Sequence, residues 1–531
     1  MRRILATAAA LALVLSGAGA ASADPVMTSR DATGYPAISW GSCTDPTLVS
    51  AKAECGYLSV PLDYAKPGGT TIKLAVSRIR STVSPQGRQG VMLVNPGGPG
   101  GSGLSLSVLG RYVPAGAGDF FDWIGFDPRG VGASKPALSC DPDYLGADRP
   151  QYAPVTAAIE KAWLKRAKGY ANDCAKRGGK LLDHMRTTDT VRDMESLRIA
   201  LGESKINFYG FSYGTYLGQV YATLYPQRVG KMVLDGNVDP GRVWYDANLD
   251  QDIAFERTMK IYFGWLARYD KVYHLGTDAK TVERLFYKEQ AKLSKKPVHG
   301  FGGAELTDVF LQAGYYVFGW EAVATAFSAL VNDRDITAVR ALFDAANPTS
   351  KGADNGYAVY LATQCTDVKW PAAWSKWRAD NTRVDRSAPF ETWGNAWFNA
   401  PCLNWAGKAG KPVAVTGKKV APVLLLSETL DGATPFTGSL EVRRRFPNAV
   451  LVEGVGGTTH AGSLFGNACV DLTVAEYLAN GTLPARLKGN TSDKKCPPLP
   501  QPDPTAKVAG KSAAGAAGLS RLELQSLIGR R

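Results

Sequence analysis

A serine in a glycine turn constrains the fold of this chain more than any other feature. Ser212 stands in the pentapeptide Gly210-Phe211-Ser212-Tyr213-Gly214, between an apolar run at 206–209 and a segment at 215–225 that favours a helix. Glycines on both sides of a serine allow a sharp strand-to-helix turn that leaves the hydroxyl exposed. The free N–H groups at the start of the helix favour negative charge there. The pattern predicts a nucleophilic serine rather than a structural serine in a glycine turn.

Short apolar segments alternate with helical stretches along much of the chain. The segments 91–94, 123–126, 206–209, 232–234, 423–426 and 450–452 have the composition of buried strands. This alternation is typical of an α/β fold with a mostly parallel sheet flanked by helices, in which sites lie at the carboxyl ends of the strands. Between residues 241 and 415 the strands disappear and helical patterns take over, and seven of the twelve tryptophans fall between Trp320 and Trp405. We therefore expect a sheet domain in two parts, 40–240 and 416–500, with an inserted, largely helical cap at 241–415.

The two ends of the chain are expected to lie outside this fold. Residues 1–23 have the pattern of a secretory signal peptide, with Arg2 and Arg3 before an apolar stretch and small residues before Asp24. Residues 24–39 are interpreted as an N-terminal extension or propeptide, and 501–531 as a flexible C-terminal tail. The apolar stretch is short for a membrane span, and the first cysteine is Cys43. We expect a secreted, extracellular protein without a membrane or lipid anchor.

Cysteine usage and charge agree with export. The chain has eight cysteines, an even number that favours disulfides in an exported protein: Cys43, Cys55, Cys140, Cys174, Cys365, Cys402, Cys469 and Cys496. Eight cysteines permit 105 pairings, and the spacing here favours pairing of neighbours in order. The chain has no C-x-x-C motif and only four histidines, so we expect neither a metal site nor a cofactor. The net charge of +13 is scattered along the chain, which favours solubility over nucleic-acid recognition.

A serine nucleophile needs a histidine base and a carboxylate that orients the histidine. In the fold expected here, the carboxylate residue follows the serine along the chain, and the histidine follows the carboxylate residue. Only His460 follows the last predicted strand, in a glycine-rich loop, whereas the other three histidines precede Ser212 or lie in the expected cap. Asp431 follows the strand at 423–426 and is the favoured acid. Asp235, which follows the strand at 232–234, is the rival, and a turn-forming aspartate is the alternative interpretation of both.

The glycine-rich segment 95–103 is expected to help bind the oxyanion. It follows the strand at 91–94, and its glycines let the backbone approach a reacting carbonyl closely. We expect the N–H of Tyr213 to donate one hydrogen bond and that of Gly98 the second, with Gly97 as the next choice. A phosphate-binding loop is disfavoured because the Lys-Ser/Thr ending is absent.

The motifs at 95–103, 127–134, 210–214 and 431–435, followed by His460, occur in an order that resembles the proline iminopeptidase-like branch of the α/β hydrolases. More closely, residues 40–496 resemble the secreted tripeptidyl aminopeptidases of actinomycetes, including the flanking regions around Cys43 and Cys55 and after Cys469. The resemblance implies an α/β-hydrolase fold and a serine exopeptidase that acts on peptides with a free N-terminus and releases short peptides.

Such specificity requires a carboxylate in the cap that pairs with the substrate ammonium. The candidates are Asp367 and Glu256, although each could be an ordinary surface or capping carboxylate. A secreted carboxylesterase that uses the same Ser-His-Asp triad is the alternative function, and a catalytically idle binding protein is a third. The sequence leaves the residue preference and the oligomeric state open.

Overall fold

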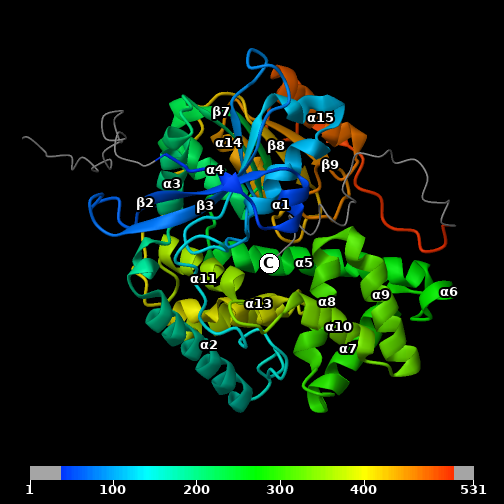
Figure 1. Ribbon diagram of the computed structural model, residues 1–531. Helices are drawn as coiled ribbons and strands as arrows, with labels where there is room; N and C mark the ends of the chain where they lie inside the picture. The colour runs from blue at the N-terminus through cyan, green and yellow to red at the C-terminus, as the bar shows by residue number, and fades with distance from the viewer. Residues whose placement is uncertain (1–36, 507–531) are drawn as a thin grey trace, which may run out of the picture. The chain divides into compact units, whose positions relative to one another are not determined.

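The computed structural model describes residues 37–506 (Figure 1). The predicted signal peptide at 1–23 lies outside the described residues, as do most of the extension at 24–39 and residues 507–531 of the predicted tail.

The described strands form one sheet in the order β1-β2-β3-β5-β4-β6-β7-β8-β9-β10. From β5 to β10 every neighbouring pair is parallel, whereas β1, β2, β3 and β5 pair antiparallel. The sequence analysis predicted six of these strands and missed the antiparallel edge and β10. The strands are β1 (Gly41–Ser42), β2 (Glu54–Pro61), β3 (Thr71–Ile79), β4 (Val91–Asn95), β5 (Asp122–Phe126), β6 (Ile206–Phe211), β7 (Val229–Asp235), β8 (Leu424–Glu428), β9 (Val450–Gly454) and β10 (Lys494–Cys496).

Both faces of the parallel part of the sheet are covered, which explains why its strands are continuously apolar. Alternate residues of one strand enter opposite cores, as Phe208 and Tyr209 of β6 do. On the Phe208 face lie α3 (Thr187–Ala200), α4 (Tyr213–Leu224) and α14 (Phe436–Arg445). On the Tyr209 face lie α15 (Ala468–Asn480) and the 3-10 segments Leu104–Tyr112 and Pro114–Phe120. The short helix α1 (Pro46–Ser50) contacts the first of these segments.

A helical layer follows β7 and ends before β8. Its helices are α5 (Tyr245–Arg268), α6 (Asp270–Tyr273), α7 (Ala279–Lys295), α8 (Gly303–Tyr315), α9 (Trp320–Ser328), α10 (Thr337–Ala346), α11 (Asn355–Asp367), α12 (Trp374–Asp385) and α13 (Thr392–Asn399). Figure 1 shows α5 crossing between the sheet and other helices of this layer. The layer also includes α2 (Ala157–Gly178), which lies within the range 40–240 predicted for the sheet domain. Trp163 of α2 stacks on Trp397 of α13, with 5.7 Å between ring centroids.

Four disulfides join the cysteines in sequential pairs: Cys43–Cys55, Cys140–Cys174, Cys365–Cys402 and Cys469–Cys496. Two of them begin in helices, because Cys365 belongs to α11 and Cys469 to α15. Within residues 37–506, no helix is long and apolar enough to cross a membrane. The same residues contain no cluster of His, Cys, Asp and Glu that could hold a metal ion.

Candidate active site

Ser212 occupies the turn between β6 and α4, at the carboxyl edge of the sheet. Its backbone has φ 54° and ψ −126°, a conformation that is strained for a residue with a side chain. The turn is held by a hydrogen bond from Ser212 N to Asp235 O (2.9 Å) and by close packing of its glycines. A Cβ on Gly214 would lie 2.7 Å from Asn95 O, so only glycine fits there. The predicted strand-turn-helix setting is therefore present, and Ser212 remains partly exposed.

His460 and Asp431 meet at the same edge of the sheet. The Nδ1 atom of His460 lies 2.8 Å from Oδ2 of Asp431, and both side chains are buried. Thr434 donates its hydroxyl to the same Oδ2 (2.7 Å), and the backbone N–H groups of Ala433 and Thr434 donate to Oδ1. These three bonds fix the carboxylate so that one oxygen faces the imidazole.

The imidazole of His460 lies against the residues that support the nucleophile turn. Its Nε2 is buried and has no hydrogen-bond partner among residues 37–506. A Cβ on Gly236 would lie 3.1 Å from Cε1 of the imidazole, and the preceding residue, Asp235, accepts the hydrogen bond from Ser212 N. The imidazole and the serine therefore flank the same two residues. The ring also lies against Tyr315 and Tyr316 at the end of α8.

The electrostatics of this pair favour a protonated imidazole. Burial by itself lowers the pKa of His460, but the charge and hydrogen bond of Asp431, with the charge of Asp235, raise it above its ordinary value of 6.5. A histidine that takes a proton from a hydroxyl needs this stabilisation of its charged form.

Asp235, the rival acid, has different partners. Its Oδ2 accepts hydrogen bonds from the backbone N–H (2.8 Å) and the hydroxyl of Ser463, and Tyr209 bonds the same hydroxyl at 2.7 Å. Asp235 thus anchors the loop three residues after His460. The geometry favours Asp431 over Asp235 as the residue that orients the imidazole.

The glycine-rich segment 95–103 lies directly against the serine turn. A Cβ on Gly97 would lie 2.8 Å from Cβ of Ser212 and 3.0 Å from Tyr213 N. The hydrogen bonds of the described residues use the N–H of Gly97, which donates to Asn95 Oδ1, and give no partner to the N–H of Gly98 or Tyr213. These two N–H groups are the donors expected from the sequence.

The motif at 127–134, to which the sequence analysis assigned no role, holds this loop in place. Buried Asp127 accepts hydrogen bonds from the hydroxyl of Ser102 (2.6 Å) and from the N–H groups of Gly103 and Ala133. Beside it, Arg129 is buried and pairs with Asp193 of α3 at 2.7 Å. The repeated glycines of the motif were visible in the sequence, but the sequence did not indicate which groups donate hydrogen bonds to Asp127.

The two carboxylates expected to bind the substrate ammonium already have partners within the protein. Asp367 accepts hydrogen bonds from the N–H and the hydroxyl of Thr187, both at 2.6 Å, and from Trp244 Nε1 (3.1 Å). Its buried carboxyl therefore caps α3, and burial raises its pKa to about 6. Glu256 pairs with Lys260 (3.0 Å) and accepts from Phe390 N. Both carboxylates are thus bonded within the protein, and a role for either in binding the substrate ammonium stays a prediction.

A third carboxylate of the helical layer, which the sequence analysis missed, is less completely bonded. Asp252 of α5 is 1% exposed, and its Oδ1 accepts one hydrogen bond, from Asn395 of α13 (2.9 Å). Burial raises the pKa of Asp252 well above its ordinary value. A small cavity adjoins it, lined by asparagines such as Asn248 and Asn399 and by apolar side chains such as Trp370. The preceding residue, Gln251, donates to Ala433 O beside the Asp431 loop, which places this part of α5 near the site.

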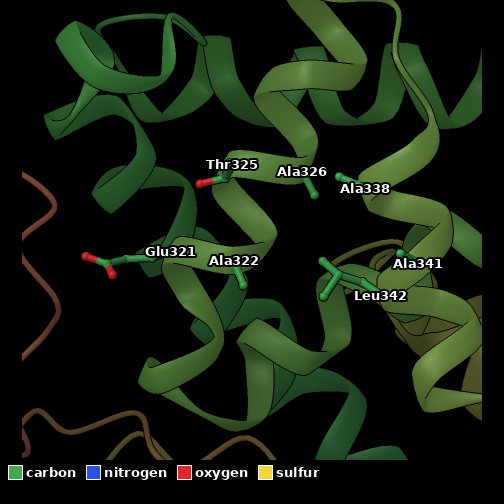
Figure 2. A pocket seen from close by; sticks show the side chains of 7 residues that line it. All are labelled: Glu321, Ala322, Thr325, Ala326, Ala338, Ala341 and Leu342. Atoms are coloured by element: carbon green, nitrogen blue, oxygen red, sulfur yellow. The ribbon is translucent and has the colours of Figure 1, made fainter.

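A second hollow lies between α9 and α10. Figure 2 shows alanine and leucine side chains from the two helices facing each other across it. It is lined by Glu321, Ala322, Thr325, Ala326, Ala338, Ala341 and Leu342. None of the candidate site residues belongs to this lining, so it is no part of the candidate active site.

Comparison with known proteins places these residues in a family. Residues 90–294 match the alpha/beta hydrolase fold family, and residues 388–496 match the family described as TAP-like protein. The tripeptidyl aminopeptidase of Streptomyces lividans is 42% identical over 481 residues, 88% of each chain. Serine protease Hip1 of Mycobacterium tuberculosis is 30% identical over 91% of this chain and 96% of its own. Carboxylesterase B of the same species is 32% identical over 88% of this chain and 91% of its own. With this similarity along nearly its whole length, the chain belongs to the tripeptidyl aminopeptidase family of the α/β hydrolases.

Proposed function

We propose that the protein is a serine exopeptidase that releases tripeptides from free N-termini, with Ser212 as the nucleophile. The observation that carries this proposal is the buried Asp431–His460 pair at 2.8 Å, whose imidazole lies against Gly236 beside the serine turn and whose Nε2 has no partner among the described residues. Membership in the tripeptidyl aminopeptidase family supports the substrate class. Four disulfides support an extracellular location.

The reaction follows from the roles of these groups. His460 Nε2 takes the proton of Ser212 as the hydroxyl oxygen attacks the scissile carbonyl, while the imidazolium is stabilised by ionised Asp431. The N–H groups of Tyr213 and Gly98 donate to the oxyanion of the tetrahedral intermediate. His460 then returns the proton to the leaving amine, and an ester remains on Ser212. Water, deprotonated by His460, attacks this ester and releases the short peptide.

We place the ammonium group of the substrate at Asp252. A buried carboxylate without a cation is unfavourable, and an arriving ammonium would provide one. Asp252 is the buried carboxylate on α5 that has one bonded oxygen and a small cavity of mixed lining beside it. The Asn395 amide donates one hydrogen bond to Asp252 and one to Asn248 O, and these bonds hold the carboxylate in place.

Three chromogenic substrates test the activity in parallel: a tripeptide anilide with a free amine, its N-acetylated twin, and a short-chain nitrophenyl ester. We expect rapid cleavage of the free peptide, little of the acetylated one, and no turnover by Ser212→Ala. Ester hydrolysis without cleavage of either peptide would instead support a carboxylesterase, the activity for which one relative is named.

The position of the ammonium site is tested by Asp252→Asn, with Glu256→Gln as the matched control on the same helix. Loss of a charged partner at a binding site costs about 2–3 kcal/mol, or roughly 30–150-fold. We expect kcat/KM for the free-amine peptide to fall by this factor in Asp252→Asn and not in the control. Ester hydrolysis should be unchanged in both variants. Equal losses on the ester and the peptide would place Asp252 in the folded framework instead.

A further inference from the structure

Glu428 ends β8 with a buried carboxyl group that the proposed reaction does not use. The residue is 5% exposed, and Oε2 of its side chain has no hydrogen-bond partner among residues 37–506. Burying a carboxylate without a cation or a full set of donors is costly, so such a group is retained only where the surrounding structure holds it. Its position therefore requires an explanation.

The carboxyl lies against the loop that carries His460. A side chain on Gly454 or Gly457 would overlap the carboxyl oxygens of Glu428, and a Cβ on Gly462 would lie 2.9 Å from Oε1. Backbone hydrogen bonds also join the chain after β8 to the chain after β9, including the bond from Leu430 N to Gly457 O at 2.9 Å. The loop thus closes around this carboxyl on both sides of His460, which explains its glycines.

The C-terminal segment closes the far side of the carboxyl. Leu499 N–H donates a hydrogen bond to Glu428. The segment is fixed just before this point, because Val455 N donates to Cys496 O (2.9 Å) and Cys496 is disulfide-bonded to Cys469 of α15. Glu428 therefore lies between the Asp431 loop, the His460 loop and the C-terminal segment.

Burial, together with two neighbouring carboxylates, raises the pKa of this carboxyl. Burial raises the pKa of Glu428 to about 8, and the negative charges of Asp235 and Asp431 add to the effect. The other charged groups around it are already paired. On the neighbouring strands, Glu453 pairs with Lys495. On α14, Arg443 pairs with Asp493 and Glu441 pairs with Arg444. Asp471 at the start of α15 accepts hydrogen bonds from Leu464 N and Gly466 N, and His460 pairs with Asp431.

We propose that Glu428 is a positioning residue, whose neutral carboxyl fills the space behind the His460 loop and sets the position of the imidazole relative to Ser212. The proposal rests on the proposed function only through the role of His460 as the base. Ionisation of Glu428 then places a third negative charge beside Asp235 and Asp431 and pushes the loop away. Activity consequently falls at alkaline pH for a reason that lies in the enzyme and not in the substrate.

The test measures how fast an amine-free fluorophosphonate phosphonylates the serine, with loss of fluoride, from pH 6 to pH 10. An amine-free probe is needed because a peptide substrate loses its own ammonium charge in the same range. The variants are Glu428→Gln, which is neutral at every pH, Glu428→Ala, which leaves a cavity, and Glu453→Gln as the control on the neighbouring strand. Ser212→Ala shows that labelling is at the serine.

In the wild-type protein and Glu453→Gln we expect the labelling rate to fall above about pH 8. Glu428→Gln should label within about twofold of wild type at pH 7 and keep that rate to pH 10, whereas Glu428→Ala should label at least about tenfold more slowly at every pH. An unchanged alkaline fall in Glu428→Gln would overturn the proposal, and so would a wild-type rate in folded Glu428→Ala. If Glu428→Ala does not fold, the pH profile of Glu428→Gln decides alone. Failure of the peptidase proposal would show in peptide cleavage and leave this labelling intact.

Thermal unfolding gives an independent readout. A carboxyl with a folded pKa of about 8 and an ordinary value of 4.5 stabilises the fold below pH 4.5 and loses that contribution as pH rises to 8. The unfolding temperature of Glu428→Gln should therefore gain on that of wild type between pH 4.5 and pH 8. A constant difference across this range would contradict a neutral carboxyl in the folded protein.

Discussion

One buried aspartate ends β7 and another lies in the loop that follows β8, at the same edge of the sheet, yet the two have different partners. Asp431 reaches the imidazole of His460 at 2.8 Å, whereas Asp235 bonds Ser463, three residues further along the same loop. Both side chains are at most 1% exposed. Burial and strand position therefore do not distinguish a residue that orients the base from one that anchors its loop.

The difference arises from the local chain after each strand. Asp431 is followed by a turn in which Ala433 N–H and Thr434 hydroxyl and N–H donate to its carboxylate, so its remaining lone pair faces Nδ1. Asp235 is followed by Gly236, which lies against the imidazole and leaves no room for a side chain. After β7, Gly236 packs against the imidazole of His460, whereas after β8, Asp431 orients the imidazole through a hydrogen bond.

The largest expected effect separates the two aspartates by kinetics. Asp431→Asn removes the charge that stabilises the imidazolium and should lower kcat by about 10³–10⁴-fold. Peptide and ester turnover should fall together, because both use the same base. Steady-state kinetics on both substrates checks this, and a loss of less than tenfold would show that Asp431 is not the orienting acid.

A smaller effect is expected at the other loop. Asp235→Asn keeps an oxygen for Ser463 but removes the charge that strengthens both hydrogen bonds, so the anchor of the His460 loop weakens by about 1–2 kcal/mol. We expect kcat to fall roughly tenfold with KM little changed. If Asp235→Asn is as inactive as Asp431→Asn, and circular dichroism shows both variants to be folded, the two aspartates do not have the different roles assigned to them.

The smallest effect is a shift of the acid limb of the pH profile. His460 must be neutral to act as a base, and its pKa is raised, so wild-type activity should rise with pH through a midpoint above 6.5. Asp431→Asn removes the main group that raises this pKa, and burial then moves the residual limb below 6.5. Asp235→Asn should move the limb less, because its charge is the weaker influence on His460. Fluorophosphonate labelling between pH 5 and 8 measures the midpoints, and equal shifts in both variants would contradict this ranking.

Much of the fold and of the candidate site could be predicted from local patterns. The six buried strands were visible because strands covered on both faces are continuously apolar. The serine turn was visible because its geometry requires glycines at fixed positions. The edge strands β1–β3 were missed, since an antiparallel edge alternates exposed and buried residues and carries no strong apolar signal.

Local sequence patterns could not predict which carboxylates of the cap are available to a substrate. Asp367 looked like a ligand for the substrate because it follows Cys365 in the helical segment, but its oxygens are taken up by Thr187, 180 residues away in sequence. Asp252 had no local signal, because its partner Asn395 lies on another helix. Whether a carboxylate is available to a substrate depends on donors that only folding brings to it.

The sequence by itself determined the parallel sheet, the serine turn and the presence of a histidine after the last predicted strand, because each depends on residues within one short segment. The tertiary structure decided which aspartate faces His460, which carboxylates of the helical layer are already satisfied, and that Glu428 lies behind the His460 loop. These outcomes depend on distances between strand ends and helices that are far apart in the chain. In a buried site, the distance between two groups strongly affects their hydrogen bonds and the pKa of each carboxyl group.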